Sequence, residues 1–91
     1  MCGIAGFLRQ HPGSDLRPSL DRVQQAIAHR GPDDRGTWVS TRQHAAFAHT
    51  RLSVLDPSPA GHQPMAVADQ RFTITYNGEI YNFAELRASL V

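Results

Sequence analysis

The sequence contains no lysine, a single cysteine and no long hydrophobic run. One cysteine, Cys2, cannot form a disulfide within the chain, which favours a reducing compartment and predicts a cytoplasmic protein. No apolar stretch approaches the roughly 20 residues that span a bilayer. The apolar start, residues 1–8, lacks the basic residues of a signal peptide. We therefore expect no membrane partner.

The sequence also lacks a strong net charge and a recognisable pattern of metal ligands. The formal net charge is +1, which gives no electrostatic reason to expect nucleic acid as a partner. The five histidines show no ligand-like spacing, and the cysteine stands alone at the N-terminus, so we expect no metal. The chain also has no glycine-rich loop that could cradle a phosphate. No cofactor is therefore expected within these residues.

The composition and periodicity that are present predict a small globular unit of mixed secondary structure. With 91 residues and 41% hydrophobic residues, the chain can form at most one small domain. Hydrophobic spacing predicts a helix, and short apolar or alternating runs predict strands. The helix is expected over 18–28, strands over 3–8, 37–40, 45–49 and 52–55, and irregular structure over 29–36 and 56–64.

The C-terminal third predicts a hairpin followed by a helix. Residues 71–76 alternate, which predicts a strand with Phe72, Ile74 and Tyr76 on its buried face. Asn77-Gly78 is a strong hairpin signal, so a second strand is expected over 79–82. A helix is expected over 83–90, with Asn82 as N-cap; the chain ends within it, as in a truncated domain. Four aromatic residues are expected in the core: Trp38, Phe47, Phe72 and Tyr76.

Cys2 is the first candidate catalytic residue. Removal of Met1 would give Cys2 a free α-amine, with a pKa of about 8, next to a thiol with a pKa of about 8.5. One residue would then hold a nucleophile and a general base, and the thiolate is the attacking species. Gly3 would leave room for a substrate near the backbone. By itself, however, an N-terminal cysteine is more often incidental.

Five sequence blocks, in order along the chain, change that interpretation. The chain resembles the class II glutamine amidotransferases, which are N-terminal nucleophile hydrolases, and specifically their asparagine synthetase branch. The Cys-Gly start and the Asn-Gly pair are common to several branches, whereas the Arg-Gly-Pro-Asp-Asp and Gly-His-Gln-Pro blocks favour this one. The blocks are Met1-Cys2-Gly3-Ile4-Ala5-Gly6-Phe7, His29-Arg30-Gly31-Pro32-Asp33-Asp34, His49-Thr50-Arg51-Leu52-Ser53-Val54-Leu55-Asp56, Ala60-Gly61-His62-Gln63-Pro64-Met65 and Tyr76-Asn77-Gly78-Glu79-Ile80-Tyr81-Asn82.

The resemblance implies a role for each candidate site residue. Cys2 is the nucleophile, and Asn77 and Gly78 donate hydrogen bonds to the oxyanion that forms when the thiolate attacks the glutamine amide. Arg51 binds the substrate α-carboxylate, for which a guanidinium offers a planar fork. The remaining implied substrate-binding residues are Leu52, Ser53, Val54, Leu55 and Glu79.

Several residues in these blocks keep two interpretations. His29 could be a second catalytic base, or it could belong to a loop that orders the pocket wall or contacts a neighbouring domain. The second interpretation is favoured because the α-amine already supplies a base. The same two interpretations apply to His62. Glu79 could contact the substrate ammonium or be solvated. Without the family pattern, Asn77-Gly78 would be an ordinary turn and Arg51 a surface residue.

The resemblance also implies a fold that is longer than this chain. It is an α+β fold of the N-terminal nucleophile hydrolase type, with stacked antiparallel β-sheets flanked by helices, of which residues 1–91 supply the first half. The ATP-binding synthetase domain, with its ATP and Mg²⁺, is absent, as is a later acidic residue for the substrate ammonium. Half a two-sheet sandwich leaves one core face uncovered, so we expect the isolated chain to be unstable or poorly active.

The expected function is hydrolysis of L-glutamine to glutamate and ammonia. The resemblance implies that ammonia then passes to a synthetase domain, of the same or a companion chain, which makes asparagine from aspartate and ATP. Two alternatives remain. The chain could belong to an amidotransferase with another acceptor, because acceptor choice lies in the absent domain. It could also be a non-catalytic remnant that binds glutamine or a partner protein.

Overall fold

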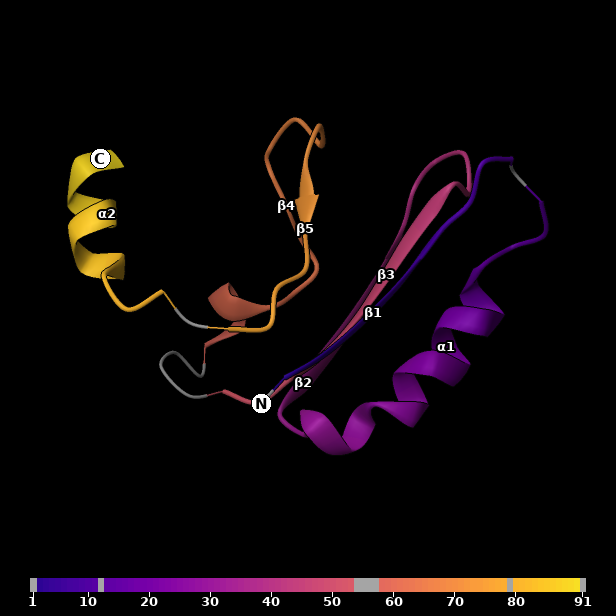
Figure 1. Cartoon of the computed structure of the whole chain (residues 1–91), viewed down its shortest axis with the longest axis horizontal. Helices are drawn as coiled ribbons and strands as arrows, with labels where there is room; N and C mark the ends of the chain where they lie inside the picture. Colours follow the sequence, from indigo (N-terminus) through magenta and orange to yellow (C-terminus); the bar gives the residue numbers. More distant parts are fainter. Residues whose placement is uncertain (1, 12, 54–57, 79, 91) are drawn as a thin grey trace.

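The computed structural model describes residues 2–11, 13–53, 58–78 and 80–90. Its main element is a three-stranded antiparallel sheet in the order β1 (Gly3–Leu8), β3 (Ala45–Arg51) and β2 (Asp34–Val39), as Figure 1 shows. The helix α1 (Arg17–Ala26) covers one face of this sheet. The predicted α+β class with antiparallel strands is confirmed.

The predicted helix over 18–28 is confirmed, with different bounds. Pro18 lies in the first turn of α1, where its missing N–H has no helical partner to lose. The α-helix ends at Ala26, and residues 28–30 form a short 3₁₀ helix, η1 (Ala28–Arg30). Leu20 belongs to α1 and is fully buried. The core consists of Leu16, Leu20, Ala46 and Ala48, with Ala5, Phe7 and Val39 packed against it.

The predicted strands over 3–8, 37–40 and 45–49 are confirmed as β1, β2 and β3, but β2 begins earlier, at Asp34. The prediction that 29–36 lacks regular structure was therefore wrong at both ends, since η1 also reaches Arg30. Gly36 signals a loop by sequence but lies inside β2. A Cβ at Gly36 would overlap the Gln63 carbonyl, so glycine admits a close crossing of two backbones.

A second, two-stranded sheet pairs β4 (Met65–Ala66) with β5 (Thr73–Ile74). The predicted strand over 71–76 is therefore only two residues long, and its partner precedes it. The predicted hairpin at 77–78 and the strand over 79–82 were wrong, because Ile80 is outside any strand and 81–82 form a turn.

The predictions for residues 52–55 and 56–64 concern the connection between β3 and β4. The predicted strand over 52–55 is not formed at Leu52 and Ser53, which follow the end of β3; residues 54 and 55 lie outside the described residues. The predicted loop over 56–64 contains a 3₁₀ turn, η2 (Pro59–Gly61), and a cis Gln63–Pro64 peptide.

The aromatic residues divide between the two sheets. Trp38 and Phe47 are half-buried and stack with ring centroids 5.1 Å apart, on the sheet face opposite α1. Phe72 and Tyr76 were predicted to be core residues, which was wrong, since they are 65% and 43% exposed. Phe72 precedes β5 and its ring lies against the Arg71 guanidinium, so alternation alone did not lead to burial.

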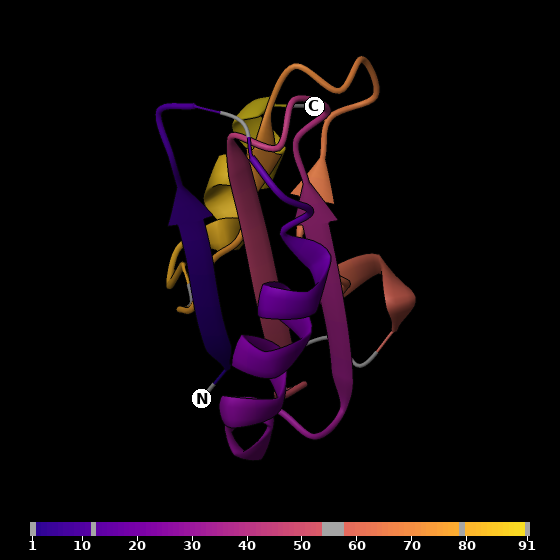
Figure 2. The ribbon, with the colours of Figure 1, turned by 90° about the vertical axis from the view of Figure 1, so that its right-hand side faces the viewer.

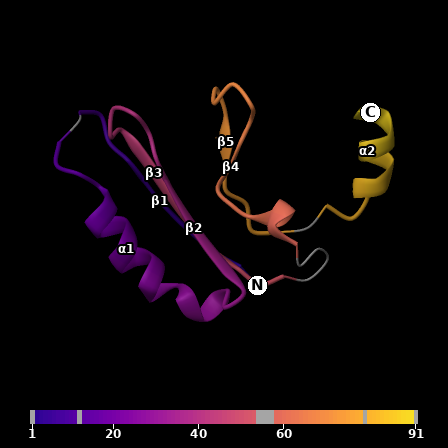
Figure 3. The same cartoon turned by 180° about the vertical axis from the view of Figure 1, so that it is seen from behind.

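The helix α2 (Phe83–Leu90) confirms the predicted C-terminal helix, while the role of Asn82 as its N-cap stays a prediction. Figures 2 and 3 show α1 on one side of the main sheet and β4, β5 and α2 on the other. The radius of gyration is 14.3 Å, above the value of about 12 Å expected for a compact chain of this length. None of the described helices is long and apolar enough to cross a membrane.

Candidate functional site

Cys2 lies where the start of β1 meets the end of β3. Gly3 pairs with Thr50 in the antiparallel ladder, which places Cys2 beside the residues that follow β3. The Leu52 N–H donates to the Cys2 sulfur at 3.3 Å. The side-chain Nε–H of Arg30 donates to the Cys2 carbonyl at 3.1 Å. Two segments that are distant in sequence therefore hold Cys2, one at its half-buried thiol and the other at its carbonyl.

Gly3 lies at a close contact between β1, β3 and the end of α1. It is buried, and a Cβ there would lie 2.6 Å from Thr50 Oγ1 and 3.2 Å from Ile27 Cβ. The small residue thus makes room for the packing of β3 against the end of α1, and room for a substrate beside it stays a prediction. Thr50 Oγ1 in turn donates to the Ile27 carbonyl at 3.0 Å, which closes the sheet against η1.

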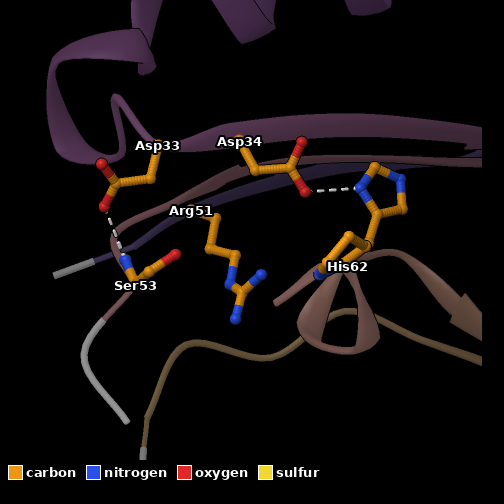
Figure 4. Close-up of a pocket in the computed structure, with 6 residues that line it drawn as sticks. Asp33, Asp34, Arg51, Ser53 and His62 are labelled. Carbon is orange, nitrogen blue, oxygen red and sulfur yellow. Dashed lines mark hydrogen bonds and ion pairs between the residues drawn. The ribbon is translucent and has the colours of Figure 1, made fainter. Parts of the chain in front are cut away.

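A pocket of about 280 Å³ opens beside the end of β3. This volume is just below the range for ligand pockets, about 300–1,000 Å³. Figure 4 shows the Arg51 guanidinium between a pair formed by Asp33 and Ser53 and a pair formed by Asp34 and His62. The pocket is lined by Asp33, Asp34, Arg51, Ser53, Pro59 and His62.

Arg51 is 8% exposed, so it is not the solvated surface arginine of the alternative interpretation. It is the last residue of β3 and pairs with Asp34 across the ladder, which aims its side chain away from α1. Its Nη1–H donates to the Ser58 carbonyl at 2.6 Å. The guanidinium lies so close to Gly61 that a Cβ there would overlap it. The cation is therefore held in one orientation.

Two carboxylates complete the charge distribution of the pocket. Asp33 Oδ2 accepts the Ser53 N–H at 2.7 Å, and Asp34 Oδ2 lies 2.6 Å from His62 Nδ1. The hydrogen bond to His62 lowers the pKa of Asp34, while partial burial opposes that shift. Asp34 is thus an anion at neutral pH, and the pocket presents both signs of charge. Such a pocket suits a zwitterionic ligand.

The oxyanion candidates lie in another segment. Asn77 and Gly78 follow β5, and the Asn77 side chain makes no hydrogen bond with any described residue. The Tyr76 phenol lies against Gly78, where a Cβ would be 2.7 Å from its hydroxyl oxygen. Among the described residues, no hydrogen bond joins Asn77 or Gly78 to Cys2. The remaining predicted site residues, Val54, Leu55 and Glu79, lie outside the described residues.

His29 and Arg30 behave differently, although they are neighbours in one sequence block. His29 is exposed in η1 and has no hydrogen-bond partner among the described residues, so both interpretations of its role stay predictions. Arg30 contacts Cys2, a role that the sequence analysis did not assign. Its position next to Gly31 was the available signal. A Cβ at Gly31 would overlap the backbone of Thr50 and Arg51, so this loop must lie directly on β3.

His49 is a second residue that the sequence analysis missed. It is fully buried, and its Nε2 lies 3.2 Å from the Tyr76 carbonyl oxygen. Burial lowers the pKa of the imidazole, and the hydrogen bond to Tyr76 opposes that shift. Its alternation with Arg51 along β3 was the sequence signal, because residues i and i+2 share one face of a strand.

The described residues contain no group of three or more His, Cys, Asp or Glu side chains arranged to hold a metal ion. The arrangement places the Cys2 thiol, the buried Arg51 cation and neighbouring carboxylates near one end of the main sheet. A thiolate can attack an activated carbonyl, and the guanidinium can bind a carboxylate.

Comparison with known proteins gives a consistent result. The sequence profile of a family described as the glutamine amidotransferase domain matches residues 1–91. The amidase chry2 of Gibberella zeae is 38% identical over 99% of this chain and 15% of its own length. The glutamine-hydrolysing asparagine synthetase 1 of Bacillus subtilis is 39% identical (99% and 14%), and the asparagine synthetase of Triphysaria versicolor is 40% identical (99% and 15%). No solved structure gives a significant match.

Proposed function

This chain belongs to the glutamine amidotransferase domain family, and from that premise we propose that it hydrolyses L-glutamine to glutamate and ammonia. It spans about 15% of the length of the curated relatives named above, so the activity of a whole protein is part of the proposal. The observation that carries it is the Cys2 thiol, held by the Leu52 N–H one residue beyond the buried Arg51.

The proposed first step is nucleophilic attack by Cys2. After removal of Met1, the α-amine takes the thiol proton and the thiolate attacks the side-chain amide carbon of glutamine. A carbon–sulfur bond forms, the carbon–nitrogen bond breaks, and the proton leaves with ammonia. Water then hydrolyses the thioester, which releases glutamate and restores the thiol. Because the sulfur is held in place, less entropy is lost when the reacting groups reach a productive geometry.

Two further groups support this chemistry. Asn77 and Gly78 donate hydrogen bonds to the oxyanion of each tetrahedral intermediate, where removal of one donor typically costs 10²- to 10³-fold in kcat. Arg51 binds the α-carboxylate through its buried guanidinium, whose planar fork matches a carboxylate. We propose that the neighbouring residues 52–55 and Glu79 complete the substrate pocket, and that the whole domain has the two-sheet N-terminal nucleophile hydrolase fold.

We propose that the ammonia acceptor is aspartate, activated by ATP, because two relatives are named as glutamine-hydrolysing asparagine synthetases. ATP and Mg²⁺ would bind outside residues 1–91, because this sequence has no glycine-rich phosphate loop. The relative named as an amidase favours a second possibility, an amidotransferase with another acceptor. A single catalytic thiol that must stay reduced favours a cytoplasmic location.

Release of ammonia from amide-labelled glutamine tests this function in the protein that carries these residues. The account predicts equal amounts of labelled ammonia and glutamate from the unmodified protein, and none from Cys2→Ala. The matched control is Leu8→Ala, which truncates an exposed side chain on the same strand and should keep the activity. Hydrolysis that survives Cys2→Ala would contradict the proposed mechanism.

A further inference from the structure

The main chain of Tyr76 is held on both sides by side chains from other segments. Its N–H donates to Gln63 Oε1 at 2.6 Å, and its carbonyl oxygen lies 3.2 Å from His49 Nε2. Tyr76 is outside β5, so neither group belongs to a strand ladder. Two side chains therefore replace the backbone pairing that would otherwise fix this residue, and the next two residues are the oxyanion candidates Asn77 and Gly78.

His49 is a rigid support for this contact. It lies on β3, the central strand, and is fully buried. Its backbone carbonyl accepts a hydrogen bond from Gln24 Nε2 of α1 at 3.4 Å, which adds a helix contact at the same residue. The residue opposite on β2 is Gly36, which has no side chain to compete for the space above the sheet. The position of the His49 ring is thus set by β3, the central strand of the main sheet.

The chemistry of the contact fixes the protonation of the ring. A carbonyl oxygen can only accept, so His49 Nε2 must carry the proton, and Nδ1 then holds a lone pair. Nδ1 is buried with no partner among the described residues, so a second proton would create a buried donor without an acceptor. Arg51 and His62 disfavour the charged ring, whereas Asp34 favours it. A neutral Nε2–H tautomer results.

Gln63 is supported from β2, an edge strand of the main sheet. Its backbone carbonyl lies directly over Gly36, as the overlap with a Cβ there shows. The preceding residue, His62, is tied to Asp34 of β2 at 2.6 Å. The Gln63 side chain thus extends from a segment fixed on β2, just as His49 extends from β3. Both ends of the support belong to the main sheet.

We propose that His49 and Gln63 are positioning residues, which hold the Tyr76 main chain so that Asn77 and Gly78 present their donors at the oxyanion. This inference rests on the proposed function and deepens it. Oxyanion donors act only within a few tenths of an ångström of the required place, and an error of about 1 Å can cost about 100-fold in rate. A segment without strand partners needs such external supports.

Paired variants separate positioning from simple loss of structure. Gln63→Met removes the acceptor at nearly constant size, whereas Gln63→Glu keeps an oxygen that can accept the Tyr76 N–H. His49→Leu removes the donor, whereas His49→Gln keeps an N–H near the position of Nε2. Gln25→Met, on the exposed side of α1, is the matched control. Each protein is scored by kcat and KM for glutamine and by the rate at which iodoacetamide alkylates Cys2.

For Gln63→Met and His49→Leu, the proposal predicts a fall in kcat of about 10- to 100-fold. KM and the Cys2 alkylation rate should change less than threefold, and Gln63→Glu and His49→Gln should recover most of kcat. The proposal is overturned if Gln63→Met and His49→Leu keep kcat, or if kcat and thiol reactivity fall together. If the unmodified protein releases no ammonia, the proposed function itself fails, a result distinct from an active protein with insensitive variants.

Discussion

Asn77 is the residue whose substitution separates binding from chemistry most cleanly. Its side chain makes no hydrogen bond with the described residues, so its truncation breaks no contact within them. If its amide serves the oxyanion, Asn77→Ala lowers kcat for glutamine by about 10²- to 10³-fold with little change in KM, because the donor acts on the transition state. Steady-state kinetics with glutamine measures both constants.

The natural control for that substitution is Asn82→Ala, which removes the same side chain at the turn before α2 and should leave kcat unchanged. A kcat within threefold of the unmodified value for Asn77→Ala would contradict the oxyanion role.

Some residue roles can be predicted from the sequence blocks, whereas others are visible only from the contacts in the structure. Cys2 and Arg51 were predicted from the family resemblance, and the structure adds that the first is held by Leu52 and the second is buried. Arg30 and His49 were missed because each acts on a main-chain carbonyl about 27 residues or more away. No residue-type pattern marks such a partner, since every residue has a carbonyl.

Among the elements, the contact of α1 with the main sheet carries the core. Leu20 is fully buried there, whereas Leu8, at the end of β1, is 88% exposed. Leu20→Ala should reduce stability by about 2–5 kcal/mol, because it removes buried apolar atoms and leaves a cavity. Leu8→Ala should change it by less than about 0.5 kcal/mol.

Hydrogen exchange at the backbone amides of β3 measures this difference locally. Leu20→Ala should speed exchange along the central strand, and Leu8→Ala should not. Equal effects of the two substitutions would show that the face under α1 is not the main core of this part of the molecule.

The elements that sequence periodicity predicts are those with a buried face. α1, β1 and β3 were found where expected, because spacing of apolar residues follows the surface that they bury. The start of β2 was missed because the adjacent Gly31 and Pro32 and a cluster of charges predicted irregular structure as far as Gly36. Gly36 in fact lies in β2, where it admits a crossing backbone. The β4–β5 pairing was missed because Asn77-Gly78 was taken for the turn, whereas the pairing closes earlier, between Ala66 and Thr73.

At the scale of the whole molecule, two groups couple stability to pH. The pKa of His49 is lowered by burial from its usual 6.5, so below about pH 6.5 the unfolded state binds the proton more tightly than the folded state. Stability should therefore fall as the pH drops through this range. The pKa of Asp34 is lowered by His62 from 3.8, so a second loss begins when the pH approaches 3.8.

Exchange-derived stability of the β3 amides at pH 7.5, 6.0 and 5.0, corrected for intrinsic rates, measures the first loss. His49→Gln, which has no titrating ring, should remove the decline between pH 7.5 and 5.0. A decline that persists in this variant would assign the effect to other groups.

The arrangement of the whole molecule was predicted only in its class. The α+β class followed from the pattern, but the separation of β4, β5 and α2 from the main sheet did not, because local spacing carries no information on how far apart two elements lie. Large apolar side chains remain exposed on this side, including Phe72 and Phe83. The expected instability of the isolated chain stays a prediction.

The central claim is that Cys2 is a processed, reactive nucleophile in a glutamine pocket. Mass spectrometry of the N-terminal peptide, after treatment of the protein with a diazoketone analogue of glutamine, tests it directly. The account predicts one adduct on Cys2 in a peptide that lacks Met1, and its loss in excess glutamine. A Met-free Cys2 that stays unmodified, or an adduct that excess glutamine does not reduce, would contradict the account.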